Sequence, residues 1–190
     1  CGGVSIYSER ISDKSEADAL ADICTGELHV AKVERREKRE SPPALYDLTT
    51  LQREANRELG FTAQQTLDYL QSLYEKCLVT YPRTDSRFLT DGMAATVPGL
   101  VNVAARLLEV DAPVDINAEQ VCDSSKVTDH HAVVPTASAA SANLAALPEG
   151  EATVLRLVCC QLLCAVSEPF TYAETTVEAE CGGHTFKARG

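Results

Sequence analysis

The heptapeptide Thr80-Tyr81-Pro82-Arg83-Thr84-Asp85-Ser86 directly follows an amphipathic helical pattern, and the rest of the chain is organised around it. It places a phenol, a guanidinium, aliphatic hydroxyls and a carboxylate where a loop can present them to a ligand. Tyr81 can act as a covalent nucleophile, and Arg83 has the geometry to hold a phosphate in bidentate fashion. A surface turn with an incidental tyrosine is the alternative interpretation of this segment taken alone.

Helical periodicity dominates the middle of the chain. The spacing of apolar residues predicts helices over 48–59 and 62–78, which are joined by a tight Gly-Phe-Thr turn. This pair resembles a helix-turn-helix in outline, although most such pairs are only packing units. Further helices are predicted over 91–109, with Pro98 interrupting the pattern, and over 149–167.

The two ends of the chain alternate apolar and polar residues instead, as half-buried strands do. We predict strands over residues 3–10, 29–40, 171–180 and 184–188. A short helix is predicted over 12–23, and Gly182-Gly183 supplies the glycines of a hairpin turn. We therefore expect the end segments to pair, with the helical part inserted between them.

Ser41-Pro42-Pro43 is the clearest break in the chain, because proline lacks an amide donor and disfavours helix in the residue before it. We predict three parts: a strand-rich segment over 1–41, a helical domain with Tyr81 over 42–136, and a return helix with strands over 137–190. Within the last part, the Ala/Ser-rich run 137–147 is expected to be an exposed linker.

Composition limits the class of protein. A chain of 190 residues suits one ordinary domain or two small ones. The net charge of −11 is unusual for nucleic-acid-binding domains, which carry a basic excess, but the local placement of Lys and Arg decides binding. No apolar run approaches the roughly 18 residues of a membrane span. Neither end carries a targeting signal, so we expect a cytoplasmic piece of a longer protein.

The eight cysteines do not form a zinc motif. Structural zinc sites use paired C-x2-C spacings with a second pair or histidines at matching distance, and the chain has none. Without a secretory signal, we expect the thiols to be mostly reduced. Cys159, Cys160 and Cys164 fall in an apolar helical run, which favours core packing, and we predict no metal site in this chain.

A second polar cluster lies some forty-five residues beyond the first. It contains Asp123, Ser124, Ser125, Lys126, Thr128, Asp129, His130 and His131. A lone histidine is usually structural, but adjacent histidines after an aspartate favour proton transfer near neutral pH. If the two clusters meet, Tyr81 can attack a phosphodiester, Arg83 can neutralise the phosphorus centre and His130 can handle protons.

Three blocks of this sequence resemble the ordered signature blocks of type IA DNA topoisomerases. They are Leu45-Tyr46-Asp47-Leu48-Thr49-Thr50-Leu51-Gln52-Arg53-Glu54-Ala55-Asn56, Thr80 to Ser86, and Asp129-His130-His131-Ala132-Val133-Val134-Pro135-Thr136. The Tyr-Pro-Arg and Asp-His-His versions are most similar to the topoisomerase III branch. The resemblance covers most of the chain, and the flanking strands resemble the family's β-rich arch.

The resemblance implies roles for individual residues. Tyr81 matches the nucleophile that becomes linked to a 5′ phosphate, Arg83 matches the arginine that holds the scissile phosphate, and His130 matches the active-site histidine. Residues expected to contact substrate are Thr84, Asp85, Ser86, Lys126, His131, Gln52 and Arg53, the last two as weaker candidates.

The resemblance also implies partners outside this chain. The family's Mg²⁺ is bound by an acidic cluster in a Toprim domain, and no Asp-x-Asp of that kind occurs here. A basic domain that clamps single-stranded DNA is also expected elsewhere in the parent protein. We therefore expect a fragment with mixed α and β structure, in which a helical domain is inserted into a β-rich arch. The fragment is expected to be inactive alone, whereas the parent protein is expected to relax or decatenate DNA without ATP.

A non-catalytic helix-turn-helix module that binds duplex DNA is the alternative. It would require a basic recognition face on the second predicted helix. That helix carries Asp68 and Glu75 with only Lys76, which counts against it. Duplex preference with a steep salt dependence of binding would distinguish this alternative from the first.

Overall fold

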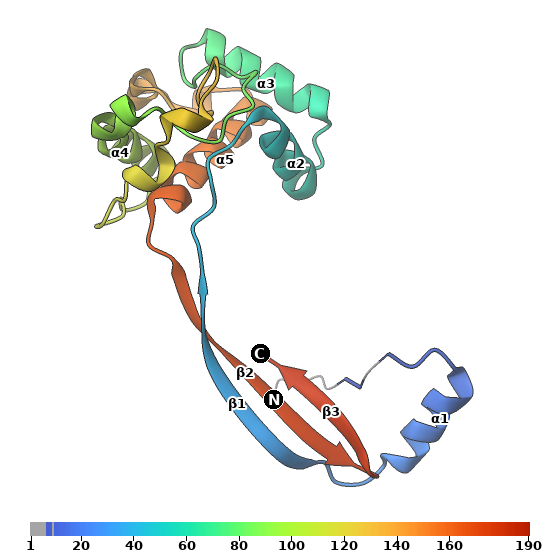
Figure 1. Cartoon of the computed structure of the whole chain (residues 1–190). Helices are drawn as coiled ribbons and strands as arrows, with labels where there is room; N and C mark the ends of the chain where they lie inside the picture. The colour runs from blue at the N-terminus through green and yellow to red at the C-terminus, as the bar shows by residue number, and fades with distance from the viewer. Residues whose placement is uncertain (1–6, 9) are drawn as a thin grey trace. The chain divides into compact units, whose positions relative to one another are not determined.

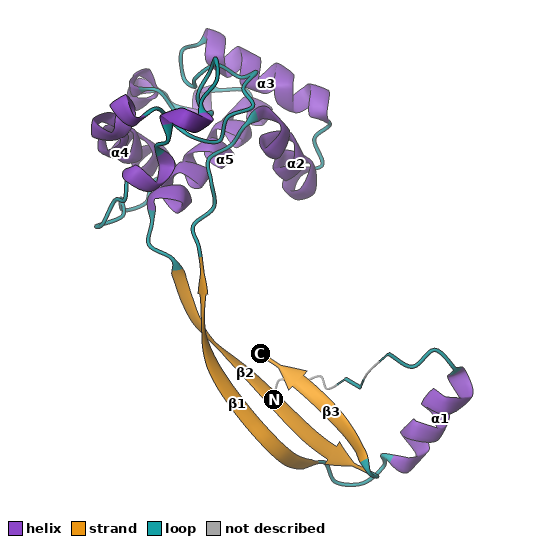
Figure 2. Cartoon of the chain, viewed as in Figure 1, coloured by secondary structure: helices purple, strands orange, loops and turns teal. Residues whose placement is uncertain are grey.

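A computed structural model describes residues 7, 8 and 10–190 of the chain. Its contacts divide the protein into two compact units, a sheet unit built from residues up to Glu40 with Phe170–Gly190, and a helical unit over Ser41–Pro169. Strands occur in the first and helices dominate the second (Figure 2). The protein is thus a mixed α and β structure, as the sequence predicts.

The sheet unit contains three antiparallel strands in the order β1-β2-β3 (Figure 1). Their bounds are β1 His29–Glu40, β2 Phe170–Cys181 and β3 His184–Arg189. Pairing of β1 with β2 runs from His29 opposite Glu180 to Glu40 opposite Phe170, with a bulge between Val30 and Lys32. The helical unit is therefore entered from β1 and left into β2 through two paired strand ends.

The turn between β2 and β3 requires its glycines. Gly182 and Gly183 have φ angles of 57° and 78°, in the left-handed region that other residues rarely adopt. A side chain on Gly182 would also collide with Ile23, the last residue of helix α1 (Lys14–Ile23). Asp13 caps α1 by accepting from the amides of Ser15 and Glu16.

Most of the N-terminal strand predicted over 3–10 lies outside the described residues. Within the described part, Tyr7 forms an isolated antiparallel bridge to Lys187, with N–O distances of 2.9 and 2.8 Å.

Local capping signals set the first two helices of the helical unit. Helix α2 (Leu48–Leu59) begins with a capping box made by Asp47 and Thr50, and helix α3 (Ala63–Glu75) begins with one made by Thr62 and Gln65. Caps of this kind contribute about 1 kcal/mol each to helix stability. Gly60, with φ of 71°, ends α2 in the left-handed conformation and reverses the chain toward α3.

Two further helices complete this unit, α4 (Val97–Leu108) and α5 (Glu149–Val166). The sequence predicts one helix over 91–109, but Asp91–Thr96 forms a 3₁₀ helix and α4 begins after it. Pro98 lies in the first turn of α4, where its missing amide donor is tolerated, so it marks a helix start and does not interrupt a helix.

Helix α5 packs against α4, α3 and α2, and its buried face forms the centre of the core. Large core side chains without exposure include Leu51, Leu70, Leu73, Val101, Leu155 and Leu162. Because of this packing, Ala137–Pro169 belongs to the helical unit, whereas the sequence grouped residues 137–190 with the terminal strands.

One expectation for this region holds only in part and another is wrong. Most residues of the run 137–147 are exposed, as predicted, but the run also forms short 3₁₀ turns, buries Ala139 completely and accepts a hydrogen bond from Arg106 at 3.2 Å. Cys159 is buried, but Cys160 and Cys164 are exposed on α5. An apolar composition alone does not reveal which helix face the core covers.

No helix in the described part of the chain has the length and apolar character that crossing a membrane requires.

Candidate active site

The heptapeptide 80–86 follows α3 as a loop with bends at Thr80, Pro82 and Arg83, and burial alternates along it. Pro82, Thr84 and Ser86 are buried, Tyr81 is half-buried, and Arg83 and Asp85 are exposed. The odd-numbered residues are therefore the more exposed ones, and the even-numbered ones hold the segment to the unit.

Thr80 fastens this segment to the strand-like stretch that carries the histidines. Its amide donates to the Val134 carbonyl at 3.0 Å. Its hydroxyl donates to the Ala132 carbonyl and accepts from the Val134 amide, both at 3.0 Å. The two polar clusters that lie far apart in the sequence are therefore joined beside Tyr81.

Thr84 and Ser86 extend this connection. The Thr84 hydroxyl donates to the His130 carbonyl at 2.8 Å and accepts from the Ser86 amide at 3.1 Å. The Ser86 hydroxyl donates to the Lys126 carbonyl at 2.9 Å. Both side chains, predicted from the sequence to contact substrate, are only 6% and 4% exposed. Their hydroxyls serve the loop, because alternation turns them inward.

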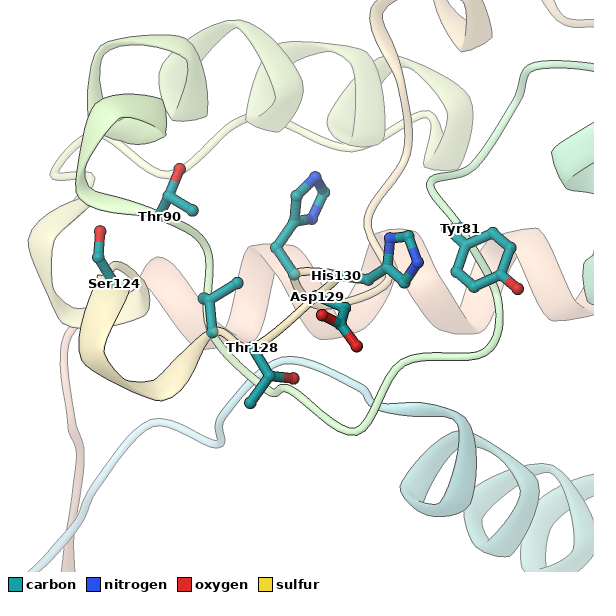
Figure 3. Close-up of a pocket in the computed structure, with 8 residues that line it drawn as sticks. Tyr81, Thr90, Ser124, Thr128, Asp129 and His130 are labelled. Carbon is teal, nitrogen blue, oxygen red and sulfur yellow. The ribbon is translucent and has the colours of Figure 1, made fainter.

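Tyr81 and His130 form the centre of the candidate site. Their ring centroids are 4.2 Å apart with the planes inclined by 39°. Both line a cavity of about 240 Å³, and in Figure 3 the phenol oxygen lies at the end of the ring that points away from His130. Tyr81 also makes an edge-on contact with Tyr74, with the ring centroids 5.6 Å apart and an angle of 83° between the ring planes.

Arg83 is exposed and does not line this cavity. It makes no hydrogen bond or ion pair with any residue that the structure describes. Its guanidinium is therefore available to an external anion, two residues after Tyr81 in the chain.

The other residues predicted to contact substrate differ in the hydrogen bonds that they make within the protein. Asp85 accepts a hydrogen bond from the Thr128 hydroxyl at 3.1 Å. His131 lines the cavity, and its Nδ1 lies 2.9 Å from the Ala132 carbonyl, to which it donates in the Nδ1-protonated tautomer.

Lys126 is held in place by two contacts. It forms an ion pair with Asp123 at 2.8 Å and lies 4.4 Å above the centre of the Phe88 ring. The hydrogen bond from Lys126, followed by that from Ser125, lowers the pKa of the Asp123 carboxyl from its ordinary value. Part of the positive charge of Lys126 is thus already neutralised.

Gln52 and Arg53 lie on α2 and do not line the cavity. Gln52 donates to the Ala63 carbonyl at 2.9 Å, which ties α2 to the start of α3. Arg53 is exposed and has no hydrogen-bond or ion-pair partner within the described residues. The structure does not bring either residue together with Tyr81.

Two residues of this region, one that lines the cavity and one that contacts Tyr81, were not identified from the sequence. Thr90 lines the cavity because Leu89 is fixed by hydrogen bonds with the backbone of Val121 and Asp123, a pairing without a local sequence signal. Tyr74 could have been found, since it lies seven residues before Tyr81 on the last turn of α3, but its helical spacing assigned it to the core.

A metal ion has no evident ligand set here. Across residues 7, 8 and 10–190, no three His, Cys, Asp or Glu side chains are grouped as metal ligands. The site therefore offers phenol, imidazole, guanidinium and hydroxyl groups, which suit binding and attack on a phosphate ester.

Comparison with known proteins assigns the chain to a family. A family model described as DNA topoisomerase matches residues 3–190. DNA topoisomerase 3 of Bacillus licheniformis is 42% identical over 192 residues, which cover 95% of this chain and 26% of that protein. DNA topoisomerase 3 of Bacillus subtilis is 38% identical over 168 residues, covering 85% and 23%. The chain spans about a quarter of the length of these relatives.

A solved structure agrees at the level of the fold. Full-length topoisomerase I from Thermotoga maritima superposes with a TM-score of 0.66 and 21% identity, covering 98% of this chain and 32% of that one.

The fold and the matched sequence together define a member of the DNA topoisomerase family, to which this chain belongs. Within that family it is of type IA, in the topoisomerase III branch, as its three sequence blocks indicate. The alternative of a non-catalytic helix-turn-helix module is not favoured by these relatives.

Proposed function

We propose that the protein containing this chain cleaves and reseals one strand of DNA through a 5′-phosphotyrosine at Tyr81, and so relaxes or decatenates DNA without ATP. The observation that carries the proposal is the shared cavity of Tyr81 and His130, within a chain of the topoisomerase family. The chain by itself is proposed to be inactive, because it spans about a quarter of its relatives.

The proposed chemistry is a transesterification. The Tyr81 oxygen attacks the phosphorus and loses its proton, while the bond from phosphorus to the 3′ oxygen breaks and that oxygen gains a proton. Attack by the 3′ hydroxyl on the phosphotyrosine reverses both bond changes and reseals the strand. Since one phosphate ester replaces another, the step needs no external energy source.

Individual side chains have separate parts in this proposal. His130 exchanges protons with the reacting oxygens from its place in the cavity, and the exposed Arg83 neutralises charge on the phosphate. Asp85, Lys126 and His131 contact the DNA strand on either side of the reacting phosphate.

The remaining predicted contact residues act less directly. Thr84 and Ser86 position the segment through their buried hydroxyls. Gln52 and Arg53 are proposed to meet DNA further along α2.

Partners outside the chain complete the proposal. The described residues do not fit a Mg²⁺ site, so the ion of the full-length parent would be held by its Toprim domain, and no step above depends on it. Single-stranded DNA and a DNA-clamping domain are the other partners, in a cytoplasmic protein. We also propose that α2 and α3 form a helix-turn-helix-like unit within a helical domain inserted into the arch, since Glu40 and Phe170 are paired where the chain enters and leaves.

The test uses the longer protein with Mg²⁺ and a single-stranded oligonucleotide. A denaturant-resistant protein–DNA adduct should form and should carry the 5′ phosphate on Tyr81, as peptide mapping would show. Tyr81→Phe should abolish the adduct, while Tyr172→Phe in the sheet unit serves as a matched control and should retain it. Equal trapping by Tyr81→Phe would disprove the assignment.

A further inference from the structure

Tyr81 also lines a second cavity, which the proposed chemistry leaves unused. This cavity has a volume of about 510 Å³ and is formed at the end of α3 by Tyr74, Glu75 and Cys77 together with Thr80, Tyr81 and their neighbours. Its size falls within the range of roughly 300–1,000 Å³ that is typical of small-molecule sites. We call it the α3-end cavity.

The α3-end cavity has an aromatic wall that is open to a ligand. Tyr74 is 39% exposed even though the edge of one ring packs on the face of the other in its contact with Tyr81. Exposed aromatic rings are the usual platforms on which single-stranded nucleic acids stack their bases. The exposed ring of Tyr74, beside the proposed nucleophile Tyr81, is therefore available to stack on a DNA base.

The charge of the cavity also favours a base over a phosphate. None of the described residues that line it is Lys or Arg, and Glu75 contributes a carboxylate. One Glu75 oxygen accepts from the Gln71 side-chain amide at 3.1 Å, which orients the group, while the other has no hydrogen-bond partner among the described residues. A carboxylate repels phosphate and accepts hydrogen bonds from exocyclic amino groups of bases.

The covalent link to Tyr81 determines which nucleotide can reach the α3-end cavity. Cleavage leaves the 5′ phosphate on Tyr81, so the nucleotide bearing that phosphate stays attached to this chain. Tyr81 and His131 line both cavities, which allows one nucleotide to place its phosphate at the first and its base in the second.

We propose that the α3-end cavity binds the base of the nucleotide whose 5′ phosphate is transferred to Tyr81, stacking it on Tyr74 and preferring, through Glu75, a base that carries an exocyclic amino group. This inference rests on the proposed function for the identity of the nucleotide.

The first test is photochemical and needs no catalysis. The full chain is irradiated with a short 5′-phosphorylated oligodeoxynucleotide whose first base is 5-iodouracil, a probe that cross-links to stacked aromatic rings. The cross-link should map to Tyr74, persist in Tyr74→Phe and fall at least about tenfold in Tyr74→Leu, as expected for loss of a stacked base. Cross-linking elsewhere, or no cross-link, overturns the proposal.

Tyr81→Phe separates this inference from the proposed function. The variant keeps the ring that lines the cavity, so the cross-link to Tyr74 should be unchanged although no adduct can form. An adduct on Tyr81 in the longer protein without a cross-link at Tyr74 would overturn the base site alone. A cross-link at Tyr74 without any adduct would overturn the nucleophile alone.

The second test measures base preference. Oligonucleotides that begin with cytosine, adenine or guanine should bind the chain about three- to tenfold more tightly than those that begin with thymine. Glu75→Ala should remove this ratio. Asp68→Ala removes the same charge from the same helix without lining the cavity, and should leave the ratio unchanged. Equal ratios in both variants would overturn the role of Glu75.

Discussion

Replacing Thr84 with valine removes one buried hydroxyl while keeping the shape of the side chain. That hydroxyl joins the segment of Tyr81 to the carbonyl of His130 and also satisfies the amide of Ser86. We expect the variant to lower the stability of the helical unit, because both partner groups lose their hydrogen bonds at once.

The magnitude follows from where the two orphaned groups lie. His130 is exposed, so water can reach its carbonyl in the variant, whereas the Ser86 residue is 4% exposed and its amide stays unpaired. One buried unsatisfied donor costs roughly 1–3 kcal/mol, which predicts a loss of about 2 kcal/mol for Thr84→Val. Thr84→Ser keeps the hydroxyl and loses a methyl group, at a cost of about 1 kcal/mol.

Urea unfolding followed by far-UV circular dichroism would measure this difference, since the signal comes mainly from the helices. With a slope of about 2 kcal/mol per molar urea, the midpoint of Thr84→Val should fall by about 1 M without a change of slope. Thr49→Val is the control, because Thr49 is exposed on α2 and should change stability by less than about 0.5 kcal/mol. A midpoint of Thr84→Val at or above that of Thr84→Ser would refute the reasoning.

Two further predictions concern glycines and thiols. Gly150→Ala should lower the free energy of unfolding by about 1–3 kcal/mol, since its new methyl would overlap the Tyr69 ring. Gly99→Ala on α4 meets nothing within 4 Å and should raise the free energy of unfolding by up to about 1 kcal/mol. Equal urea midpoints for the two variants would contradict this prediction. Iodoacetamide should alkylate the exposed Cys77 in the native chain, but Cys159 only after unfolding, because burial raises the pKa of the Cys159 thiol to about 12. Mass spectrometry of peptides would decide, and similar native rates would show that α5 is not packed as described.

Local sequence signals predicted most of the secondary structure. Alternation located β1, β2 and β3, and Gly60 and Thr62 marked the end of α2 and the start of α3 within a residue or two, whereas α3 ends at Glu75, three residues before the predicted end. Pro98 was misread, because a proline within a helical pattern and one in the first turn of a later helix look alike in a sequence. The 3₁₀ turns and the buried Ala139 of the run 137–147 were not predicted, because small residues pack well without a marked pattern.

The candidate site was predicted only in part. The sequence brought Tyr81 and His130 into one hypothesis, and the structure places both rings on one cavity. It gave Thr84 the same substrate-contacting role as Asp85, although the first is buried and the second exposed. Which side chains of this segment are buried depends on its hydrogen bonds to residues 130–134, and those contacts are evident only in the folded chain.

By itself, the sequence determined the helices, the strands, the hairpin at Gly182-Gly183 and the family, because caps, periodicity and ordered blocks are local. Tertiary structure alone decided that Thr80 and Thr84 join two segments about fifty residues apart, and that Tyr81 lies between two cavities. Such contacts depend on how α5 packs the unit together, and they combine groups whose spacing along the chain carries no signal.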